Sequence, residues 1–477
     1  MTASQELLDV ARYLRRVRPL DPEEIQTYLS TPTHPAVIRE QLRSVAVGLG
    51  IKEREDGCFV PVEETPLELA FDGVERLPAE HVARLESRLS ASIGPEWASG
   101  GSGEKLRVTL RETKASYFAG EPVEYDDTTA LAYACYHLPA YYAAVQYPLA
   151  ALAAAKLVPR RLRALDVGAG VGGPALGVHD LLGPEAVVEY HAVEPSAAAA
   201  VFEEMLAAVR PEFQTTLHRV PAEEFDAARA LEDRPIGSGP PEFDLIVFAN
   251  VLSELDDPVA VTRRYAELLA PEGTMLLLAP ADRTTATGLR EVERALVDDG
   301  PLGLFAPTLR LWEGAQPTAS TWSFVRQPSL DVPRFQRALD APAGSEGTFL
   351  HPEVQYAFAL LRRDGARASD VRPSVQKHAR LADAEMHVTE RLDLLAVKLS
   401  PNLAAEEGSN PVFLIGDGSE DAPHYAVVAN TTALNHPLVD AAYGAVLSFE
   451  NALLLWNDDE AAYNLVVDDQ TLVETLR

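Results

Sequence analysis

Apolar positions along residues 163–281 alternate between short continuous runs and helical spacing. Runs such as RALDVGAG, AVVEYHAVEPS and EFDLIVFANVL are mainly apolar without alternation, which is typical of strands that are buried on both faces. Between them, segments such as ALGVHDLLG, AAVFEEMLAAVR and PVAVTRRYAELLA carry apolar residues three and four positions apart, which indicates helices. This alternation predicts an α/β fold with a parallel sheet that is covered by helices on both faces.

The first 65 residues follow a different pattern. Three segments with helical spacing, 4–20, 20–29 and 34–50, precede IKEREDGCFVPV, which alternates around an Asp56-Gly57 turn and predicts a hairpin. Asp21 and Pro22 are suited to the N-cap and first position of the second helix. This order predicts a winged-helix-like module over residues 1–65. The alternative is a helical cap on the main domain.

The C-terminal part reads as a series of short strands separated by turn signals. VTERLDLLAVKL, NPVFLIGDGS, HYAVVAN, GAVLSFENALLLW and AAYNLVVDD predict a five-stranded β-barrel of the OB type over residues 385–477. The α/β domain then covers residues 125–370, and a helical and loop connection covers 66–124. Within these parts, 95–104 and 340–350 read as loops and 355–363 as a late strand.

The charge is strongly acidic. The chain of 477 residues has 72 acidic and 41 basic residues and a formal net charge of −31, and arginine carries most of the positive charge. An acidic surface that is poor in lysine suggests a halophilic, cytoplasmic protein. At roughly 1 M salt the Debye length is about 3 Å, so the net charge does not exclude a nucleic-acid partner.

Several classes of protein are made improbable by what the sequence lacks. The N-terminus has no apolar core of a secretory signal. The most apolar stretch, 141–158, contains Gln146 and Lys156 and predicts a buried helix rather than a membrane span. Cys58 and Cys135 are the only cysteines, which argues against a disulfide framework and a cysteine-built metal site.

The glycine-rich run LDVGAGVGGPALGV, residues 165–178, is the strongest functional signal. It lacks the Gly-Lys-Ser/Thr ending of a P-loop, so a dinucleotide site and an S-adenosylmethionine (SAM) site are compared. Asp166, directly before the glycines Gly168, Gly170 and Gly172, can receive the amino group of SAM but would repel a pyrophosphate. Gly173-Pro174 opens a helix whose free N–H groups can face the carboxylate of the methyl donor.

The following strand ends supply further candidate ligands. Glu194 in AVEPS can accept both ribose hydroxyls, although dinucleotide enzymes use an acid there too. Glu223 in VPAEEF occupies the usual position of an adenine-contacting acid, and Asn250 begins the loop that faces the substrate. We predict that these residues bind SAM. The alternative is that Asp166 and Glu194 only cap strand ends.

Two further segments, taken with the glycine-rich run, show a resemblance to a known protein family. YDDTTALAYACYHLPAYYAAV (125–145) and FANVLSEL (248–255), taken with LDVGAGVGG, resemble archaeal-type members of the mitoribosomal small-subunit protein-22 family over residues 120–365. These are methyltransferase-like proteins that are associated with the small ribosomal subunit and its assembly. The resemblance implies SAM binding by Asp166, Gly168, Gly170 and Glu194. It also implies that Asn250 and Glu254, the candidate catalytic residues, face the substrate pocket.

The sequence departs from that family in one respect. Several members hold an iron–sulfur cluster with four cysteines, whereas the corresponding segment here, residues 304–327, contains none. Because the ligands of such clusters are thiolates, we predict no metal cluster, and no pair of histidines has a recognisable ligand spacing.

Three functions remain open at this point. The first is a SAM-dependent methyltransferase that acts on ribosomal RNA or in small-subunit assembly. The second is a SAM-binding assembly factor without turnover, and the third is a nicotinamide-dependent oxidoreductase.

We also predict that the N-terminal module and the C-terminal barrel contact RNA or the small ribosomal subunit. The barrel could stack bases on Phe413, Tyr425, Phe449 and Trp456, unless these form its core. The basic cluster Arg12, Arg15, Arg16 and Arg18 could contact RNA or be a solvated helix face.

Overall fold

The computed structural model describes residues 3–121, 123–230, 242–320, 322–404 and 408–476. The chain divides into two units. Unit 1 comprises Met1–Glu254, Glu267–Gly273 and Pro328–Val354, and unit 2 comprises Leu255–Ala266, Thr274–Gln327 and Gln355–Arg477.

The N-terminal module of unit 1 contains the predicted helices and hairpin. Its elements are α1 (Ala3–Leu14), α2 (Pro22–Gln26), α3 (Pro35–Ser44), α4 (Ala46–Leu49), β1 (Ile51–Glu53) and β2 (Phe59–Pro61). Leu20 exchanges two backbone hydrogen bonds with Phe59, so a third short segment joins the hairpin, as in a winged helix. The helix predicted over 34–50 is interrupted at Val45, whose backbone (φ −112°, ψ 8°) leaves the helical region.

The central sheet is doubly wound, as predicted. Its strands are β3 (Arg161–Val167), β4 (Val187–Val193), β5 (Phe213–His218), β6 (Phe243–Ala249), β7 (Leu269–Pro280), β8 (Gly303–Ala306), β9 (Val325–Gln327) and β10 (Val354–Arg362). The strand order is β5-β4-β3-β6-β7-β10-β8, and β9 pairs with β10. Strands β3 to β6 pair in parallel, whereas β10 runs antiparallel to β7 and β8. The sequence did not predict β8 and β9.

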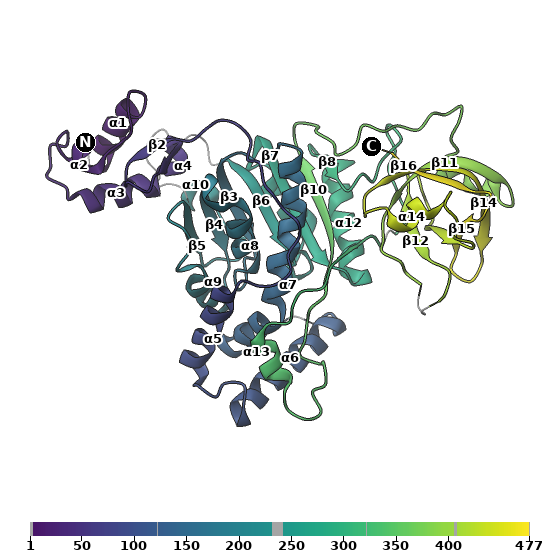
Figure 1. Cartoon of the computed structure of the whole chain (residues 1–477), viewed down its shortest axis with the longest axis horizontal. Helices are drawn as coiled ribbons and strands as arrows, with labels where there is room; N and C mark the ends of the chain where they lie inside the picture. The colour runs from purple at the N-terminus through teal and green to yellow at the C-terminus, as the bar shows by residue number, and fades with distance from the viewer. Residues whose placement is uncertain (1–2, 122, 231–241, 321, 405–407, 477) are drawn as a thin grey trace. The chain divides into compact units, whose positions relative to one another are not determined.

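Helices flank the sheet and precede it (Figure 1). They are α5 (Ala79–Ile93), α6 (Gly100–Ala119), α7 (Asp127–Ala154), α8 (Gly173–Leu182), η1 (Gly183–Glu185), α9 (Ala198–Leu206), α10 (Ala227–Ala230), η2 (Leu252–Glu254), α11 (Pro258–Ala266), α12 (Arg283–Val297) and α13 (Arg334–Asp340). Helix α7 is the predicted buried helix. Among the described residues, none of the helices combines the length and the apolar character needed to cross a membrane.

The loop predicted over 95–104 is partly wrong, because α6 already begins at Gly100. Gly103 permits this, since a Cβ there would lie 2.1 Å from the carbonyl oxygen of Ala98. The buried guanidinium of Arg107 donates to the same carbonyl at 3.2 Å. A glycine-rich composition therefore serves here for a close approach of backbone rather than for flexibility.

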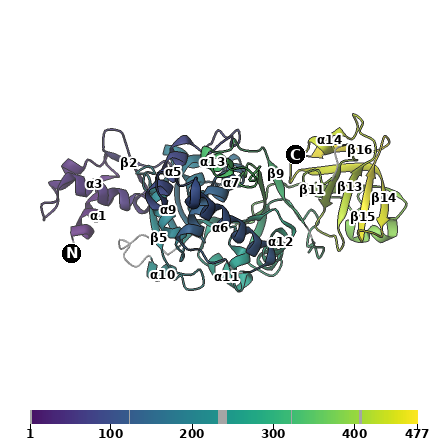
Figure 2. The same ribbon diagram turned by 90° about the horizontal axis from the view of Figure 1, so that it is seen from below.

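The C-terminal barrel of unit 2 has the OB topology, as predicted (Figure 2). Its elements are η3 (Leu381–His387), β11 (Arg391–Lys398), β12 (Val412–Gly416), β13 (His424–Val428), α14 (His436–Asp440), β14 (Val446–Asn457), β15 (Ala462–Val467) and β16 (Leu472–Leu476). The order β11-β12-β13-β15-β14 closes through a β11–β14 pairing, and only β13 and β15 are parallel. Strand β16, which was not predicted, extends the sheet beside β14.

Two of the four barrel residues that were predicted to stack on RNA bases are buried in the barrel core, so the prediction is wrong for them. Phe413 and Phe449 are 2% and 0% exposed and pack in the barrel interior, so they offer no face to a base. Tyr425 is half-buried, and Trp456 is 40% exposed. The alternative of a structural aromatic core is therefore correct for two of these four residues.

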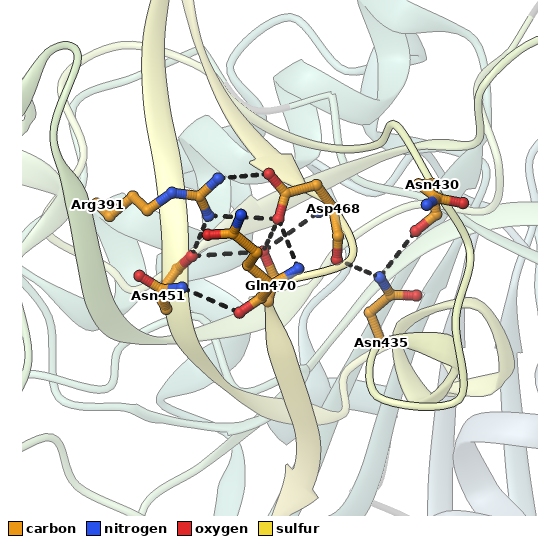
Figure 3. Close-up of polar contacts among 7 residues, drawn as sticks. Arg391, Asn430, Asn435, Asn451, Asp468 and Gln470 are labelled. Atoms are coloured by element: carbon orange, nitrogen blue, oxygen red, sulfur yellow. Dashed lines mark hydrogen bonds and ion pairs between the residues drawn. The ribbon is translucent and has the colours of Figure 1, made fainter.

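A polar network joins the strands of the barrel (Figure 3). The side-chain nitrogen of the buried Asn435 donates to the carbonyl oxygens of Asn430 (2.9 Å) and Asp468 (2.7 Å). Arg391 forms an ion pair with the Asp468 carboxylate and donates to the carbonyl oxygen of Asn451 at 2.7 Å. The bonds of Asp468 to Arg391 and Asn435 join elements far apart in sequence, so the network fixes the turn after β15 against β11 and the segment before α14.

Candidate functional site

The glycine run forms a tight loop between β3 and α8. Gly168, Gly170 and Gly172 all have positive φ, at 71°, 53° and 87°. A Cβ on Gly168 would lie 2.4 Å from Cγ2 of Val251, and one on Gly172 would lie 2.8 Å from Cδ2 of Leu206. At Gly170 the nearest atom would be 4.0 Å away. A side chain at Gly168 or Gly172 would therefore collide with its neighbours, whereas one at Gly170 would extend into free space.

Asp166 lies in β3 directly before this loop and has no exposed surface. Its Oδ2 accepts a hydrogen bond from the Tyr190 hydroxyl at 2.8 Å, but Oδ1 has no partner among the residues that the structure describes. Burial, with a contribution from Glu194, raises the pKa of the carboxyl to about 7 against the opposing effect of Tyr190. A buried acceptor without a partner is costly, so Oδ1 is suited to a charged donor such as an amino group.

Glu194 follows β4 and is 7% exposed. Its Oε2 accepts from the Gly170 N–H at 2.8 Å, and its Oε1 accepts from the N–H and hydroxyl of Ser196 at 2.9 and 2.6 Å. The carboxylate thus holds the glycine loop against the end of β4. A carboxylate oxygen accepts about two hydrogen bonds, so Oε2 keeps a position for a ribose hydroxyl.

The loop after β6 brings the two candidate catalytic residues to the same edge of the sheet, because β3, β4 and β6 are parallel. Asn250 has a positive φ of 60°, a conformation in which asparagine is enriched. Glu254 accepts from the Tyr125 hydroxyl at 3.3 Å. Although the residue as a whole is exposed, desolvation of its carboxyl raises the pKa to about 7, and Glu194 adds to this.

Glu223 lies in the turn after β5, where its side chain is exposed, whereas the preceding Ala222 is buried. Its assignment as an adenine ligand stays a prediction.

A group of rings that sequence reasoning missed lies beside the glycine loop, and we call it the aromatic wall: Tyr125, Tyr133, Tyr136, His137, Tyr141 and His351. His137 stacks on Tyr141 with ring centroids 5.2 Å apart, and His351 stacks on Tyr136 at 4.5 Å. In YACYHLPAYY the α7 members recur at spacings of three and four, which places them on one helix face. That spacing is the signal that could have found them.

Contacts at both ends fix the wall next to the predicted SAM ligands. The Tyr125 hydroxyl donates to Glu254, and the backbone carbonyl oxygen of Tyr125 accepts from the N–H of Ala197, three residues after Glu194, at 3.3 Å. A Cβ on Gly173 would lie 3.2 Å from Cβ of Tyr141, so α7 packs directly against the start of α8.

His137 is a neutral polar group within the wall. Burial holds its pKa well below the usual range, and its Nδ1 has no partner in the described part of the chain. Such a ring can exchange hydrogen bonds with an acceptor molecule but carries no charge at neutral pH.

Residues 304–327, where the resemblance would place a cluster, contain a buried serine that is paired within the chain. Ser323 is fully buried, and its hydroxyl lies 2.7 Å from that of Tyr443, while Thr321 lies outside the described residues. Within the described ranges, no group of three His, Cys, Asp or Glu side chains is arranged to hold a metal. The absence of a cluster stays a prediction.

Comparison with sequence families gives three matches. Residues 165–275 match the family described as "Methyltransferase domain". Residues 4–55 and 382–476 match the N-terminal and C-terminal domains of a domain of unknown function, DUF8157. A search of curated proteins finds no match.

Solved structures that are similar to this chain include three methyltransferases. CcbJ from Streptomyces caelestis is 24% identical, with 29% of this chain and 48% of that chain covered and a TM-score of 0.21. This chain therefore spans about half the length of CcbJ. The plantazolicin methyltransferase BpumL in complex with SAH is 12% identical (60% and 98% covered, TM-score 0.29), and the mitomycin 7-O-methyltransferase MmcR is 15% identical (76% and 93% covered, TM-score 0.25).

The fold assignment rests on the strand order and the family match rather than on these likenesses. The order β5-β4-β3-β6-β7-β10-β8, with β10 antiparallel, is that of class I SAM-dependent methyltransferases. The matched range begins in β3 and ends in β7, so it includes the glycine loop and the ends of β4 and β6. The cofactor that fits this fold is SAM.

Proposed function

We propose that this protein is a SAM-dependent methyltransferase that modifies RNA of the small ribosomal subunit. The observation that carries the proposal is the unpartnered Oδ1 of Asp166, buried at the strand end beside the glycine loop. A pyrophosphate would be repelled at this carboxylate, whereas an amino group would satisfy it. This charge argues against the nicotinamide-dependent alternative.

The chain offers a separate group for each part of the cofactor. Asp166 would hold the amino group, Glu194 the ribose hydroxyls, and the open backbone at Gly170 leaves room between them. When bound, SAM supplies an electrophilic methyl group on a sulfonium. The role of the protein is then mainly to align the acceptor in a dry site.

The acceptor side suits a flat, polar ring such as a base. The rings of the aromatic wall can stack on a base, which contributes about 1–3 kcal/mol per base in single-stranded nucleic-acid sites. Asn250 can orient an amine or ring nitrogen by a hydrogen bond. Glu254, whose pKa desolvation raises to about 7, can accept the proton that the acceptor nitrogen releases near neutral pH.

The ribosomal acceptor is supported by the resemblance of residues 120–365 to the mitoribosomal small-subunit protein-22 family. The aromatic wall suits a base as the methyl acceptor, and the resembling family is associated with the ribosome. Together these two points favour ribosomal RNA over a free small molecule as the substrate. The same resemblance leaves the assembly factor without turnover as the second candidate.

The test uses purified full-length chain in high salt with labelled SAM and isolated small subunits. We expect methyl incorporation into RNA by the wild type and at least a tenfold loss in Glu254→Gln. Asp256→Asn, an exposed carboxylate nearby in sequence, is the matched control and should retain the wild-type rate. SAM binding without incorporation into subunits or free RNA would favour the assembly factor.

A further inference from the structure

Three aromatic side chains form a row across neighbouring strands at one end of the barrel. Tyr463 of β15 lies directly opposite His424 of β13 and Trp456 of β14 in the strand register. Its ring stacks on His424 (centroids 4.8 Å apart, planes at 21°) and meets Trp456 nearly edge-on (4.7 Å, 64°). We call these three residues the aromatic row.

The row extends from the barrel core to solvent. His424 is 1% exposed, Tyr463 packs against the core, and Trp456 is 40% exposed. A tryptophan exposed to this degree has an accessible face, and its position beside Tyr463 gives that face a fixed orientation.

The two turns beside the row are acidic. Residues 416–424 and 457–463 contain no lysine or arginine, and their exposed carboxylates belong to Asp421, Asp458, Asp459 and Glu460. Asp458 accepts from the Trp456 indole N–H at 2.8 Å. Burial, together with the carboxylates of Glu385 and Asp421, raises the pKa of the Tyr463 hydroxyl, so negative charge acts directly on the row.

His424 adds an unsatisfied acceptor to the row. Its Nδ1 lies 2.9 Å from the carbonyl oxygen of Ala422, which requires the proton on Nδ1 and leaves Nε2 as a bare acceptor. Nε2 is buried and has no partner in the part of the chain that the structure describes. Burial lowers the pKa of the ring, so it stays neutral at neutral pH. The three side chains of the row therefore carry no positive charge at neutral pH, and the indole N–H of Trp456 and the Nδ1–H of His424 are already bonded within the chain.

We propose that the aromatic row and its acidic turns bind an arginine-bearing segment of a partner protein. A guanidinium stacks on the exposed face of a tryptophan such as Trp456, and its fork of N–H donors matches the exposed carboxylates of the two turns. The exposed carboxylates disfavour a phosphate backbone, so the row is poorly suited to RNA. This inference does not depend on the proposed methyl transfer, because all of its residues belong to the barrel.

The test measures binding of three fluorescein-labelled probes to the full-length chain: a peptide of six arginines alternating with glycine, the same peptide with lysine, and a twelve-nucleotide oligouridine. We expect the arginine peptide to bind at least fivefold more tightly than the lysine peptide and to quench tryptophan fluorescence. Oligouridine, which the proposed methyltransferase site could bind, should not displace the arginine peptide.

Variants separate the site from the general acidity of the chain. Trp456→Ala should weaken binding of the arginine peptide at least fivefold, Trp456→Phe should weaken it less, and Asp458→Asn/Glu460→Gln should weaken it at least threefold. Asp469→Asn/Glu474→Gln removes the same charge from exposed positions elsewhere in the barrel and should change binding less than twofold. Equal losses in both double variants, no effect of Trp456→Ala, or displacement of the arginine peptide by oligouridine would overturn the proposal.

Discussion

Two aspartates without exposed surface, Asp166 in the α/β domain and Asp417 in the barrel, are bonded in opposite ways. The Asp417 Oδ2 accepts from the Trp312 indole (2.7 Å) and the Leu381 N–H (3.0 Å), and its Oδ1 accepts twice from Ser419. Asp166 has one hydrogen bond, from Tyr190, and an Oδ1 without a partner in the described residues. The difference indicates that Asp417 holds the fold together, whereas Asp166 is kept for a ligand.

The same contrast holds for larger groups. The Asn435 network of the barrel satisfies its members within the chain, as Figure 3 shows. The aromatic wall instead contains His137, whose Nδ1 has no partner in the described ranges. In this comparison the network that the chain itself satisfies is structural, whereas Asp166 and His137 each keep an atom without a partner in the described residues and lie in the methyltransferase site proposed above.

The largest expected effect is on stability. Asp417→Ala leaves the Trp312 and Leu381 donors buried without an acceptor, so we expect a loss of ~3–5 kcal/mol in the free energy of unfolding. Asp166→Asn should cost less than about 1 kcal/mol, because one bond is replaced by another. Urea denaturation measures both. A larger loss from Asp166→Asn than from Asp417→Ala would contradict the comparison.

Substitutions at two of the three loop glycines, Gly168 and Gly170, have the next largest expected effect on stability. Gly168→Ala combines a left-handed backbone with a collision against Val251, so we expect a loss of about 2–4 kcal/mol in stability. Gly170→Ala has the same backbone requirement but open space, and should cost only ~1 kcal/mol. Thermal unfolding of the two variants compares them, and equal losses would show that packing on Val251 is unimportant.

Most of the fold could be predicted from the sequence, and so could the position of the candidate cofactor residues at strand ends. Asp166 and Glu194 lie at the ends of β3 and β4, as expected when a buried parallel strand is followed by glycine or proline, and their binding of SAM stays a prediction. Short strands with weak patterns, such as β8, β9 and β16, were missed, and so was the antiparallel direction of β10, which depends on long-range pairing. The aromatic wall was missed because α7 is apolar around its whole circumference, which hides the face that carries the rings.

A third effect concerns cofactor affinity. Glu194→Ala removes both the ribose acceptor and the bond to the Gly170 N–H, so we expect SAM binding to weaken by roughly 1–3 kcal/mol. Glu203→Ala, an exposed carboxylate on α9, is the control and should leave the affinity unchanged. Calorimetry measures both, and an unchanged affinity in Glu194→Ala would restrict this residue to a structural role.

A smaller effect appears with pH. The pKa of Asp166 in the folded protein, about 7, lies above that of an unfolded aspartate. Its contribution to the stability of the ligand-free protein is therefore fully present below about pH 4 and is lost as the pH rises through 7. A cationic amino group favours the ionised form, so SAM affinity should rise over the same range, by at most about tenfold per pH unit. Asp166→Asn should remove both dependences, which thermal unfolding and calorimetry at pH 5.5–8 would test.

Removal of metal ions is expected to have no effect on SAM binding. Because residues 304–327 contain no cysteine, chelators should leave SAM affinity unchanged, and elemental analysis of anaerobically purified protein should find no stoichiometric iron or zinc. Iron in amounts of one cluster per chain would contradict this prediction.

The most direct test of the central claim is calorimetric titration of the full-length chain in high salt with SAM, with its demethylated product and with NAD. We predict that SAM and its product bind one molecule per chain and that Asp166→Ala weakens SAM binding at least tenfold, while NAD gives no signal. Tight binding of NAD without a signal from SAM would contradict the assignment of the glycine loop and of Asp166.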